Sequence, residues 1–161
     1  MRVLSIDQSL RQSGITIYTN GMLDKALIIG APKDIKDPTA QLIDVAYKLT
    51  ALFLSIKPDV ILMEGLPYGS ASTSVRALAA LFFRIQEIAT HLGIEYKVYP
   101  PTQVKKTAGS GKASKQDMID ALPEDVITFF KDTCGVKKTT GLSDLADSYF
   151  IWLTYQNEHK E

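Results

Sequence analysis

The sequence predicts an α/β domain built on a mixed five-stranded sheet with helices on both faces. Three short apolar runs joined by turn residues open the chain, a pattern typical of antiparallel strands. Two further strand-like runs each follow a segment whose apolar residues recur at helical spacing, as in crossover units. Strands interleaved with helices indicate a layered fold, and 161 residues suit one domain. We expect this domain to span residues 1–157, with residues 158–161 as a short polar tail.

The first three strands are expected to pair in their order along the chain. Residues 2–7 form a buried apolar run, and apolar and polar side chains alternate over residues 14–19. Asn20 and Gly21 make a typical two-residue hairpin turn that leads into residues 23–30. The predicted opening of the domain is therefore three antiparallel strands.

Two helix–strand units follow in the middle of the chain. Pro38 suits the first turn of a helix, and Gly93 suits the end of one. The apolar run before Glu64 is typical of a strand that is buried on both faces. The expected elements are a helix over 38–57, a strand over 59–64, a helix from Thr73 or Ser74 to Leu92, and a strand over 94–99.

The remaining third of the chain is predicted to be helical. Pro101 begins a short helix that Gly109 interrupts, and Ser114 is a suitable N-cap for the turn that follows. Further helices are expected over residues 124–132 and about 143–155. The last of these carries an apolar stripe made of Leu145, Tyr149, Trp152 and Leu153.

The composition excludes several classes of protein. Lysine and arginine together number 18, as do aspartate and glutamate, so the chain lacks the overall positive charge of a general nucleic-acid binder. Cys134 is the only cysteine, which excludes an internal disulfide and fits a reducing cytosol. The N-terminal apolar run is too short for a signal peptide, and no run approaches the roughly 20 apolar residues of a membrane span. We expect a soluble, cytoplasmic protein with no membrane partner.

Four carboxylates occupy positions that indicate a metal site. Asp7 and Glu64 each end an apolar strand, where an ionised side chain loses hydration that a cation can replace. Asp144 and Asp147 lie three residues apart and share one helix face. All four acids can meet if the first strand is central and the strand over 59–64 lies parallel beside it. Oxygen ligands favour Mg²⁺ or Mn²⁺, so the group indicates metal-assisted phosphate chemistry.

Each carboxylate also has a purely structural explanation. Asp144 and Asp147 would stabilise the dipole at the start of their helix, with Ser143 as its N-cap. Asp7 would simply end its strand and open the following turn. Glu64 is harder to explain in this way, because glutamate is a poor turn former. That all three structural explanations hold together is less favoured than any one of them alone.

A basic segment lies apart from these acids. Between Tyr96 and Gln116 there is no acidic residue but there are five lysines: Lys97, Lys105, Lys106, Lys112 and Lys115. Such a segment can attract a nucleic-acid backbone while the carboxylates hold the metal. A solvated lysine-rich loop is the simpler alternative.

Four motifs follow one another along the chain: Ser5-Ile6-Asp7 with Gly14-Ile15-Thr16, Ile61-Leu62-Met63-Glu64, Pro101-Thr102-Gln103-Val104-Lys105-Lys106, and Asp144-Leu145-Ala146-Asp147-Ser148. In this order they resemble the motifs of the RuvC-type Holliday junction resolvases. The resemblance covers residues 2–155 and is closer to a bacteriophage-encoded member than to the bacterial housekeeping enzyme. It implies a ribonuclease-H-like fold and an endonuclease that cuts branched DNA, above all Holliday junctions.

The resemblance also implies a cofactor and roles for single residues. The family holds two Mg²⁺ ions, for which Mn²⁺ can substitute, and its products carry 5′-phosphate and 3′-hydroxyl ends. The metal-binding acids of the family match Asp7, Glu64, Asp144 and Asp147. The basic positions that contact DNA and support cleavage lie near Lys105 and Lys115, with Lys106 and Lys112 as competitors, and Arg76 is a further candidate for DNA contact.

The chain departs from the family pattern in two places. The usual Asp-Pro-Gly after the first strand is here Asp7-Gln8-Ser9, so the turn differs while the carboxylate remains. The family commonly places an aromatic residue after the second acid, where it enters the junction. Pro67 and Tyr68 occupy that region, and Tyr68 is the candidate for stacking on an unpaired base. A packed or merely exposed loop tyrosine is the alternative.

A two-fold homodimer would place one active site on each of the two symmetric strands of a junction. The long helix that ends at Leu92 is the expected dimer element, because Phe82 and Phe83 give it both a core stripe and a second apolar edge. Burial of Phe83 within the monomer is the alternative.

Two other functions fit the same residues. A DNA-structure-binding protein with weak cleavage would keep the fold and use the lysines and Tyr68 to hold branched DNA. A nuclease that acts on RNA, flaps or replication forks would keep the whole acidic set. An actin-like ATPase is excluded, because it needs a second domain that 161 residues cannot supply.

Overall fold

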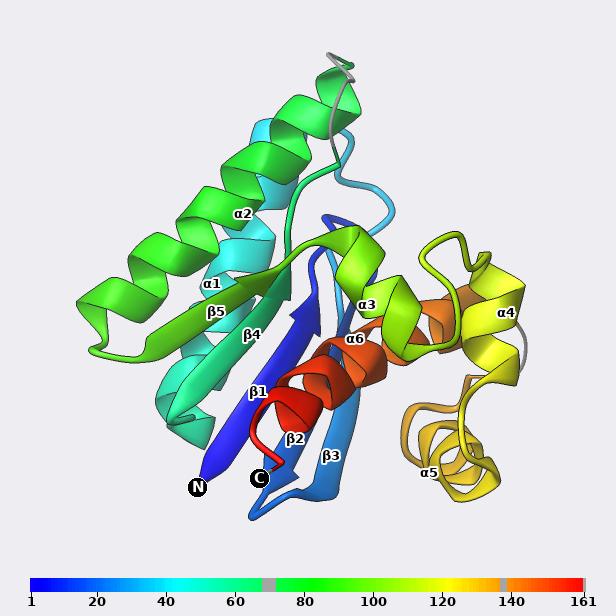
Figure 1. The fold of residues 1–161 in the computed structure, drawn as a ribbon. Coiled ribbons are helices and arrows are strands. Elements are labelled where there is room, and N and C mark those ends of the chain that lie inside the picture. Colours follow the sequence, from blue (N-terminus) through cyan, green and yellow to red (C-terminus); the bar gives the residue numbers. More distant parts are fainter. Residues whose placement is uncertain (68–71, 137–138, 161) are drawn as a thin grey trace.

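The computed structural model describes residues 1–67, 72–136 and 139–160 of the chain (Figure 1). The strands are β1 (Arg2–Asp7), β2 (Ser13–Thr19), β3 (Met22–Ile29), β4 (Val60–Glu64) and β5 (Glu95–Tyr99). The helices are α1 (Pro38–Ile56), α2 (Thr73–His91), α3 (Pro101–Thr107), α4 (Lys115–Asp120), α5 (Glu124–Cys134) and α6 (Thr139–Glu158). Every expected element is present within a few residues of its predicted bounds.

The strands form one sheet in the order β3-β2-β1-β4-β5, so β1 is central. β1 pairs antiparallel with β2 and parallel with β4, and β4 pairs parallel with β5. The predicted mixed five-stranded sheet is therefore confirmed. Because β1 and β4 are parallel neighbours with Ile6 opposite Met63, the next residues, Asp7 and Glu64, lie at the same end of the sheet.

Helices cover both faces of the sheet, as predicted (Figure 1). Successive side chains of a strand point to opposite faces. Leu4 and Ile6 of β1 belong to the apolar core under α1 and α2, and Val3 belongs to the core under α6. These two cores fix the sheet between its helical layers and leave its carboxyl ends to form a site.

Buried hydrogen bonds attach α6 to the centre of the sheet. The Ser5 hydroxyl donates to the Ser148 carbonyl oxygen at 2.7 Å, and the Ser148 hydroxyl donates to the Ser5 carbonyl oxygen at 2.9 Å. Thr16 on β2 shares a 2.7 Å hydrogen bond with the Ser148 hydroxyl. Trp152 stacks on Tyr18 of β2 with ring centroids 3.9 Å apart, which confirms its predicted place in the core. The residue before Ser148 is Asp147, whose position is thereby fixed.

The start of α2 differs from the prediction. The N-cap is Ser72, whose hydroxyl accepts a hydrogen bond from the Val75 amide at 3.3 Å, and not Thr73 or Ser74. Ser72 has extended backbone angles, whereas Thr73 is already the first helical residue. The sequence alone does not distinguish the three candidates, because Ser72, Thr73 and Ser74 all carry a hydroxyl group that suits an N-cap.

The bounds of α6 also differ from the prediction. The helix is interrupted at Thr140 and Gly141, and Gly141 takes a left-handed φ of 81°. Ser143 is therefore a buried residue inside the helix and is not its N-cap. The helix continues to Glu158, beyond the expected end near Tyr155. Glu158 accepts hydrogen bonds from the Tyr99 hydroxyl at 2.8 Å and the Gln103 amide at 3.0 Å, which hold this end in place.

Within the described residues, α1 is the one helix that is long and apolar enough to cross a membrane by length and composition alone. A third of its most apolar window is buried inside the protein, and core helices of soluble proteins pass the same test. Val45, Leu49 and Phe53 of α1 pack in the core under the sheet. This packing accounts for the apolar character of its inner face.

Candidate active site

A cavity of about 560 Å³ opens at the carboxyl ends of β1 and β4. It is bordered by the ends of these strands, by α3 and α4, and by the start of α6 (Figure 1). The cavity brings together six of the residues that the sequence singled out: Asp7, Glu64, Asp144, Asp147, Lys105 and Lys115. The meeting of the four carboxylates, expected from strand order alone, is therefore found.

A glycine allows α6 to approach the sheet closely enough to join this group. Gly14 lies opposite Asp7 in the pairing of β1 with β2. A Cβ atom at Gly14 would overlap the backbone carbonyl of Asp144 and come within 2.8 Å of the Leu145 nitrogen. Only a residue without a side chain permits this contact. The contact places Asp144, and with it Asp147, at the end of the central strand.

Asp144 also interacts with the start of its own helix. Burial raises the pKa of Asp144 overall, while Lys115 and a hydrogen bond with the Gly141 backbone both lower it. The structural explanation offered by the sequence, a carboxylate that stabilises the helix start, is therefore compatible with a place in the cavity. The same side chain serves both the helix and the site.

The carboxylates destabilise one another's charged forms. Burial, and then repulsion by Asp147, Glu64 and Asp144, raises the pKa of Asp7 well above its usual range, while Lys115 opposes the shift. Burial and then Asp147 raise the pKa of Glu64 to about 7, against the opposing effect of Lys105. Burial and then Asp144 raise the pKa of Asp147 to about 6. The lysines offset only part of the repulsion.

The donor set fits a hard divalent cation. All four acidic side chains offer oxygen ligands, they share one cavity, and their mutual repulsion would be relieved by positive charge. Among the residues that the structure describes, no three acidic, histidine or cysteine side chains already converge on one ion position.

The metal-free protein is expected to become less stable as the pH rises from about 5 to 8. The folded-state pKa values of Glu64, about 7, and Asp147, about 6, lie above the values of roughly 4 in an unfolded chain. These groups therefore favour folding fully below their unfolded pKa values, and this contribution is lost as the pH rises through the folded ones. Thermal unfolding with a chelator should give a falling Tm over this range.

Adding Mn²⁺ should raise the Tm strongly at about pH 8 and little at about pH 5, since metal binds the deprotonated carboxylates. Asp7→Asn should flatten the pH dependence, because it removes one member of the repelling group. A Tm that stays level or rises with pH in the metal-free protein would contradict this electrostatic description.

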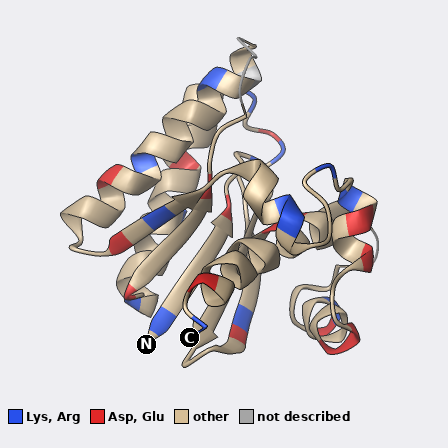
Figure 2. Cartoon of the chain, viewed as in Figure 1, with Lys and Arg blue, Asp and Glu red and all other residues tan. Residues whose placement is uncertain are grey.

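The other candidates for DNA contact lie outside the cavity. Lys106 and Lys112 are exposed and do not line it, and neither does Arg76, which is exposed on the first turn of α2. Figure 2 shows basic positions on α3 and on the segment leading into α4, beside the site. Of the four competing lysines, Lys105 and Lys115 are thus the two that line the cavity. Tyr68 lies outside the described residues.

Two further residues of the cavity with polar side chains were not predicted as site residues. Gln8, directly after Asp7, and Ser114, the N-cap of α4, both line it. The departure from the family pattern at Gln8 was the available signal for the first. For Ser114 the available signal was its position just before Lys115. Ser114 was interpreted from the sequence only as a helix N-cap, so this signal was not used.

Comparison with known proteins finds relatives that match over nearly the whole chain. No family model matches the chain. The chain is 30% identical over 163 residues to the crossover junction endodeoxyribonuclease RuvC of Prochlorococcus marinus strain AS9601, and the match covers 98% of each protein. It is 28% identical over 159 residues to the same enzyme of Campylobacter curvus strain 525.92, with 98% of this chain and 97% of the relative covered.

Solved structures agree in fold. Thermus thermophilus RuvC in complex with a Holliday junction substrate matches with a TM-score of 0.67 and 13% identity, over 99% of this chain and 96% of that one. The yeast mitochondrial Holliday junction resolvase Ydc2 matches with a TM-score of 0.64 and 18% identity, over 97% and 79%.

The sheet order and the helical layers are those of the ribonuclease-H-like fold. Within that fold class, the sequence match to a RuvC enzyme over 98% of the chain identifies the family. The chain belongs to the RuvC family of crossover junction endodeoxyribonucleases. The resemblance found in the four motifs is confirmed, and so is the predicted fold.

Proposed function

We propose that this chain is a metal-dependent, structure-selective endodeoxyribonuclease that cuts branched DNA, above all Holliday junctions. One observation carries the proposal: four carboxylates and two lysines line one cavity of about 560 Å³ in a member of the RuvC family. The products would carry 5′-phosphate and 3′-hydroxyl ends. The activity resides in one nuclease domain, which we place over residues 1–157.

The carboxylates and the lysines would have different roles in cleavage. Asp7, Glu64, Asp144 and Asp147 would hold the divalent cations, two Mg²⁺ ions for which Mn²⁺ can substitute. When bound, such ions activate a water molecule and stabilise the leaving oxygen. Lys105 and Lys115 would attract the scissile phosphate and hold it in the cavity. Their charge also favours the ionised forms of the acids that face them.

The DNA would extend beyond the cavity over neighbouring surfaces. Lys106, Lys112 and Arg76 are exposed and free to contact phosphates away from the cut. Tyr68 remains the candidate for stacking on an unpaired base. A solved relative is bound to a Holliday junction, which supports the same class of partner here. We place the protein in the cytoplasm of a bacterial or phage-infected cell, without a membrane partner.

A cleavage panel tests the proposal. A synthetic mobile four-way junction, a fork, a flap and plain duplex are incubated with Mg²⁺ or Mn²⁺ and either wild type or Glu64→Gln. We expect the wild type to cut the junction best and Glu64→Gln to cut nothing. Cleavage by Glu64→Gln would disprove the site assignment. Equal cutting of forks and junctions would keep the enzyme class and overturn the junction preference, and tight binding without cleavage would favour a DNA-binding protein.

Two exposed lysines should separate phosphate attraction from cleavage. Lys115→Ala removes a charge inside the cavity and should lower the cleavage rate at saturating DNA by about tenfold or more. Lys112→Ala, its matched control outside the cavity, should leave that rate unchanged. If each contacts one phosphate, each should flatten the salt dependence of junction binding by about one unit. Equal losses of rate in both variants would contradict the assignment of Lys115.

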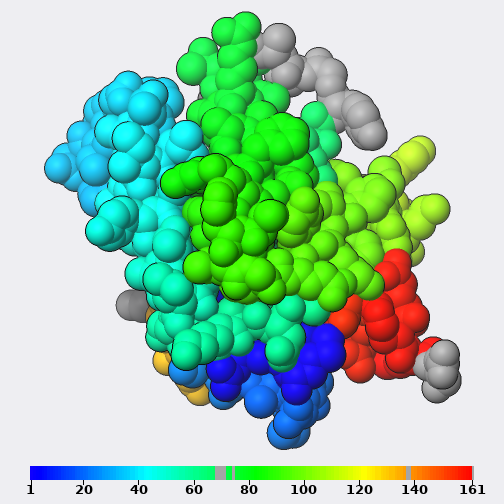
Figure 3. Space-filling model, turned by 90° about the vertical axis from the view of Figure 1, so that its left-hand side faces the viewer, coloured from blue at the N-terminus to red at the C-terminus, as the bar shows by residue number. Residues whose placement is uncertain are grey.

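A dimer is best accommodated by the face formed by α1 and α2. Phe82 is buried, whereas Phe83 is 62% exposed, so Phe83 is not part of the monomer core. Ile43, Tyr47 and Leu54 on α1 are also exposed. Figure 3 shows the two helices side by side on this face of the molecule. We propose that a second copy of the chain covers it, as a C2 junction substrate would require.

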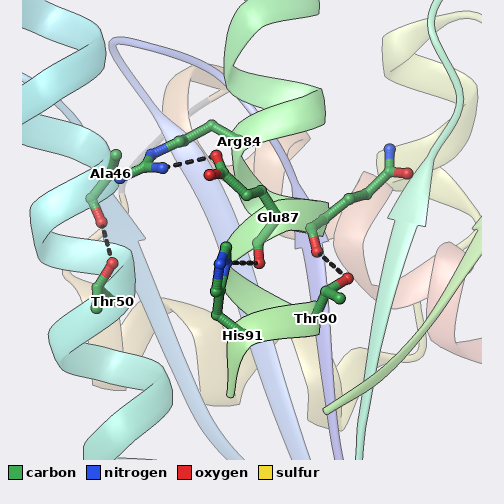
Figure 4. Close-up of polar contacts among 7 residues, drawn as sticks. Ala46, Thr50, Arg84, Glu87, Thr90 and His91 are labelled. Atoms are coloured by element: carbon green, nitrogen blue, oxygen red, sulfur yellow. Dashed lines mark hydrogen bonds and ion pairs between the residues drawn. The ribbon is translucent and has the colours of Figure 1, made fainter. Parts of the chain in front are cut away.

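A hollow of about 620 Å³ on this face, lined mainly by α1, would receive side chains of the second copy. Arg84 lines it from α2 and pairs with Glu87 at 2.6 Å (Figure 4). The hollow is therefore lined mainly by apolar side chains together with the charged Arg84, a mixture that suits a protein interface.

Phe83→Glu should convert the dimer to a monomer, because it places a charge on the exposed apolar face of α2. Light scattering at several protein concentrations measures the effect. Met22→Glu is the matched control, since Met22 is 72% exposed on β3, away from α1 and α2. A Phe83→Glu variant with the mass of the wild type would show that this face is not the interface.

A further inference from the structure

Gln8 holds the peptide group that follows Glu64. The Gln8 side chain is buried, with 7% exposed, and its amide nitrogen donates to the Glu64 carbonyl oxygen at 2.7 Å. The nitrogen of the same peptide group belongs to Gly65 and donates to the Tyr99 carbonyl oxygen at 2.8 Å. The peptide is therefore fixed from both sides, by the end of β1 and by the end of β5.

The Gln8 interaction begins where the strand pairing ends. The pairing between β1 and β4 ends at Ile6 and Met63. It therefore does not include Asp7 or Glu64. The Gln8 side chain supplies a cross-strand hydrogen bond one step beyond. It thus links the two strand ends that carry the acids closest to the centre of the sheet.

The other polar atom of Gln8 indicates that stability alone does not explain this residue. Its side-chain oxygen is buried and has no hydrogen-bond partner in the described part of the chain. A buried polar group without a partner costs about 1–3 kcal/mol. An apolar side chain of the same length would avoid this cost but would leave the Glu64 carbonyl oxygen without its Gln8 donor, at a comparable cost. The two costs largely offset each other, so glutamine gains little stability over methionine at this position.

Gln8 lies between two neighbouring cavities. Gln8 lines the acidic cavity and also a second cavity of about 450 Å³ between the turn after β1 and the starts of α1 and α2. Leu78 is the other residue that borders both cavities. Gln8 therefore forms part of the wall between the acidic cavity and this second cavity.

We propose that Gln8 is a positioning residue for cleavage, whose amide fixes the Glu64 peptide so that this carboxylate is held ready for the metal. The inference rests on the proposed function. Gln8 acts through Glu64 and touches neither the DNA nor the metal. Partners that orient a metal ligand typically change metal affinity or activity by about 10–100-fold.

The chain offers a closely matched control for this residue. Gln41 on α1 is also 7% exposed, lines the same second cavity and donates through its amide to backbone carbonyls, those of Ile35 at 2.9 Å and Lys36 at 3.3 Å. It has no hydrogen bond to Glu64. Gln8→Met and Gln41→Met therefore remove the same chemical group from equally buried sites, and only the first frees the Glu64 peptide.

The test compares three measurements on wild type, Gln8→Met, Gln41→Met and Glu64→Gln. Electron paramagnetic resonance measures Mn²⁺ binding to the DNA-free protein, thermal unfolding measures stability, and junction cleavage gives kcat and KM separately. We expect Gln8→Met to weaken Mn²⁺ binding and lower kcat, each by about tenfold or more, with KM and Tm close to wild type. Gln41→Met should lower the Tm and leave Mn²⁺ binding and kcat unchanged.

Wild-type Mn²⁺ affinity and kcat in Gln8→Met would overturn the inference, and the proposed function would stand as long as Glu64→Gln is inactive. Equal losses of kcat in Gln8→Met and Gln41→Met, each with a lower Tm, would also overturn it, because the role would then be structural only. An active Glu64→Gln variant would instead disprove the proposed site, and the inference with it.

Discussion

Asp7→Asn is expected to lower the rate of junction cleavage at least about a thousandfold, because a bound divalent ion contributes several kcal/mol to the transition state and each 1.36 kcal/mol is a factor of ten. Asp7 ends the central strand, and repulsion by each of the other three carboxylates raises its pKa, in addition to the effect of burial. An asparagine keeps the shape of the side chain but offers a neutral ligand. The DNA should still bind, since the lysines are unchanged.

The same substitution should stabilise the metal-free protein, which distinguishes loss of chemistry from loss of fold. Burial and repulsion by three neighbouring acids both oppose an ionised Asp7, and asparagine removes these effects. At about pH 8 in chelator, the Tm of Asp7→Asn should exceed that of wild type. Asp34→Asn, an exposed carboxylate in the loop before α1, is the control and should alter neither Tm nor cleavage. An Asp7→Asn enzyme that cuts at the wild-type rate would remove Asp7 from the site.

The parts of the site that follow from strand order could be predicted from the sequence. An apolar strand followed by an acid marks both Asp7 and Glu64, and the crossover connection makes their strands parallel neighbours. Helical spacing then places Asp144 and Asp147 on one face. These steps need only periodicity and topology, both of which the sequence carries locally.

The parts that depend on contacts between distant segments could not be predicted. Lys105 and Lys106 are adjacent in the sequence, and only the packing of α3 turns the first toward the cavity and the second to solvent. The bond from Gln8 to Glu64 joins residues far apart in the chain. Gly141 interrupts α6 by its backbone conformation, which a glycine allows but does not require.

Gly14→Ala is expected to reduce the free energy of unfolding by about 3 kcal/mol or more, at the upper end of what overpacking costs. The added methyl group would overlap the backbone of Asp144, and backbone cannot move aside as a flexible side chain can. Helix α6 would have to shift away from β2, against the buried hydrogen bonds that Ser148 makes with Ser5 and Thr16. Urea denaturation measures this loss directly.

The shift should also reach the active site, since the displaced residue is Asp144 itself. A misplacement of about 1 Å can lower a rate about a hundredfold, so Gly14→Ala should cut poorly even where it remains folded. Gly111→Ala is the matched control, because its added methyl group would lie 3.5 Å from the Lys106 side chain, an ordinary contact. Its stability should equal or slightly exceed that of wild type. If Gly14→Ala were as stable and active as Gly111→Ala, the close approach of α6 to β2 would not be what positions the C-terminal acids.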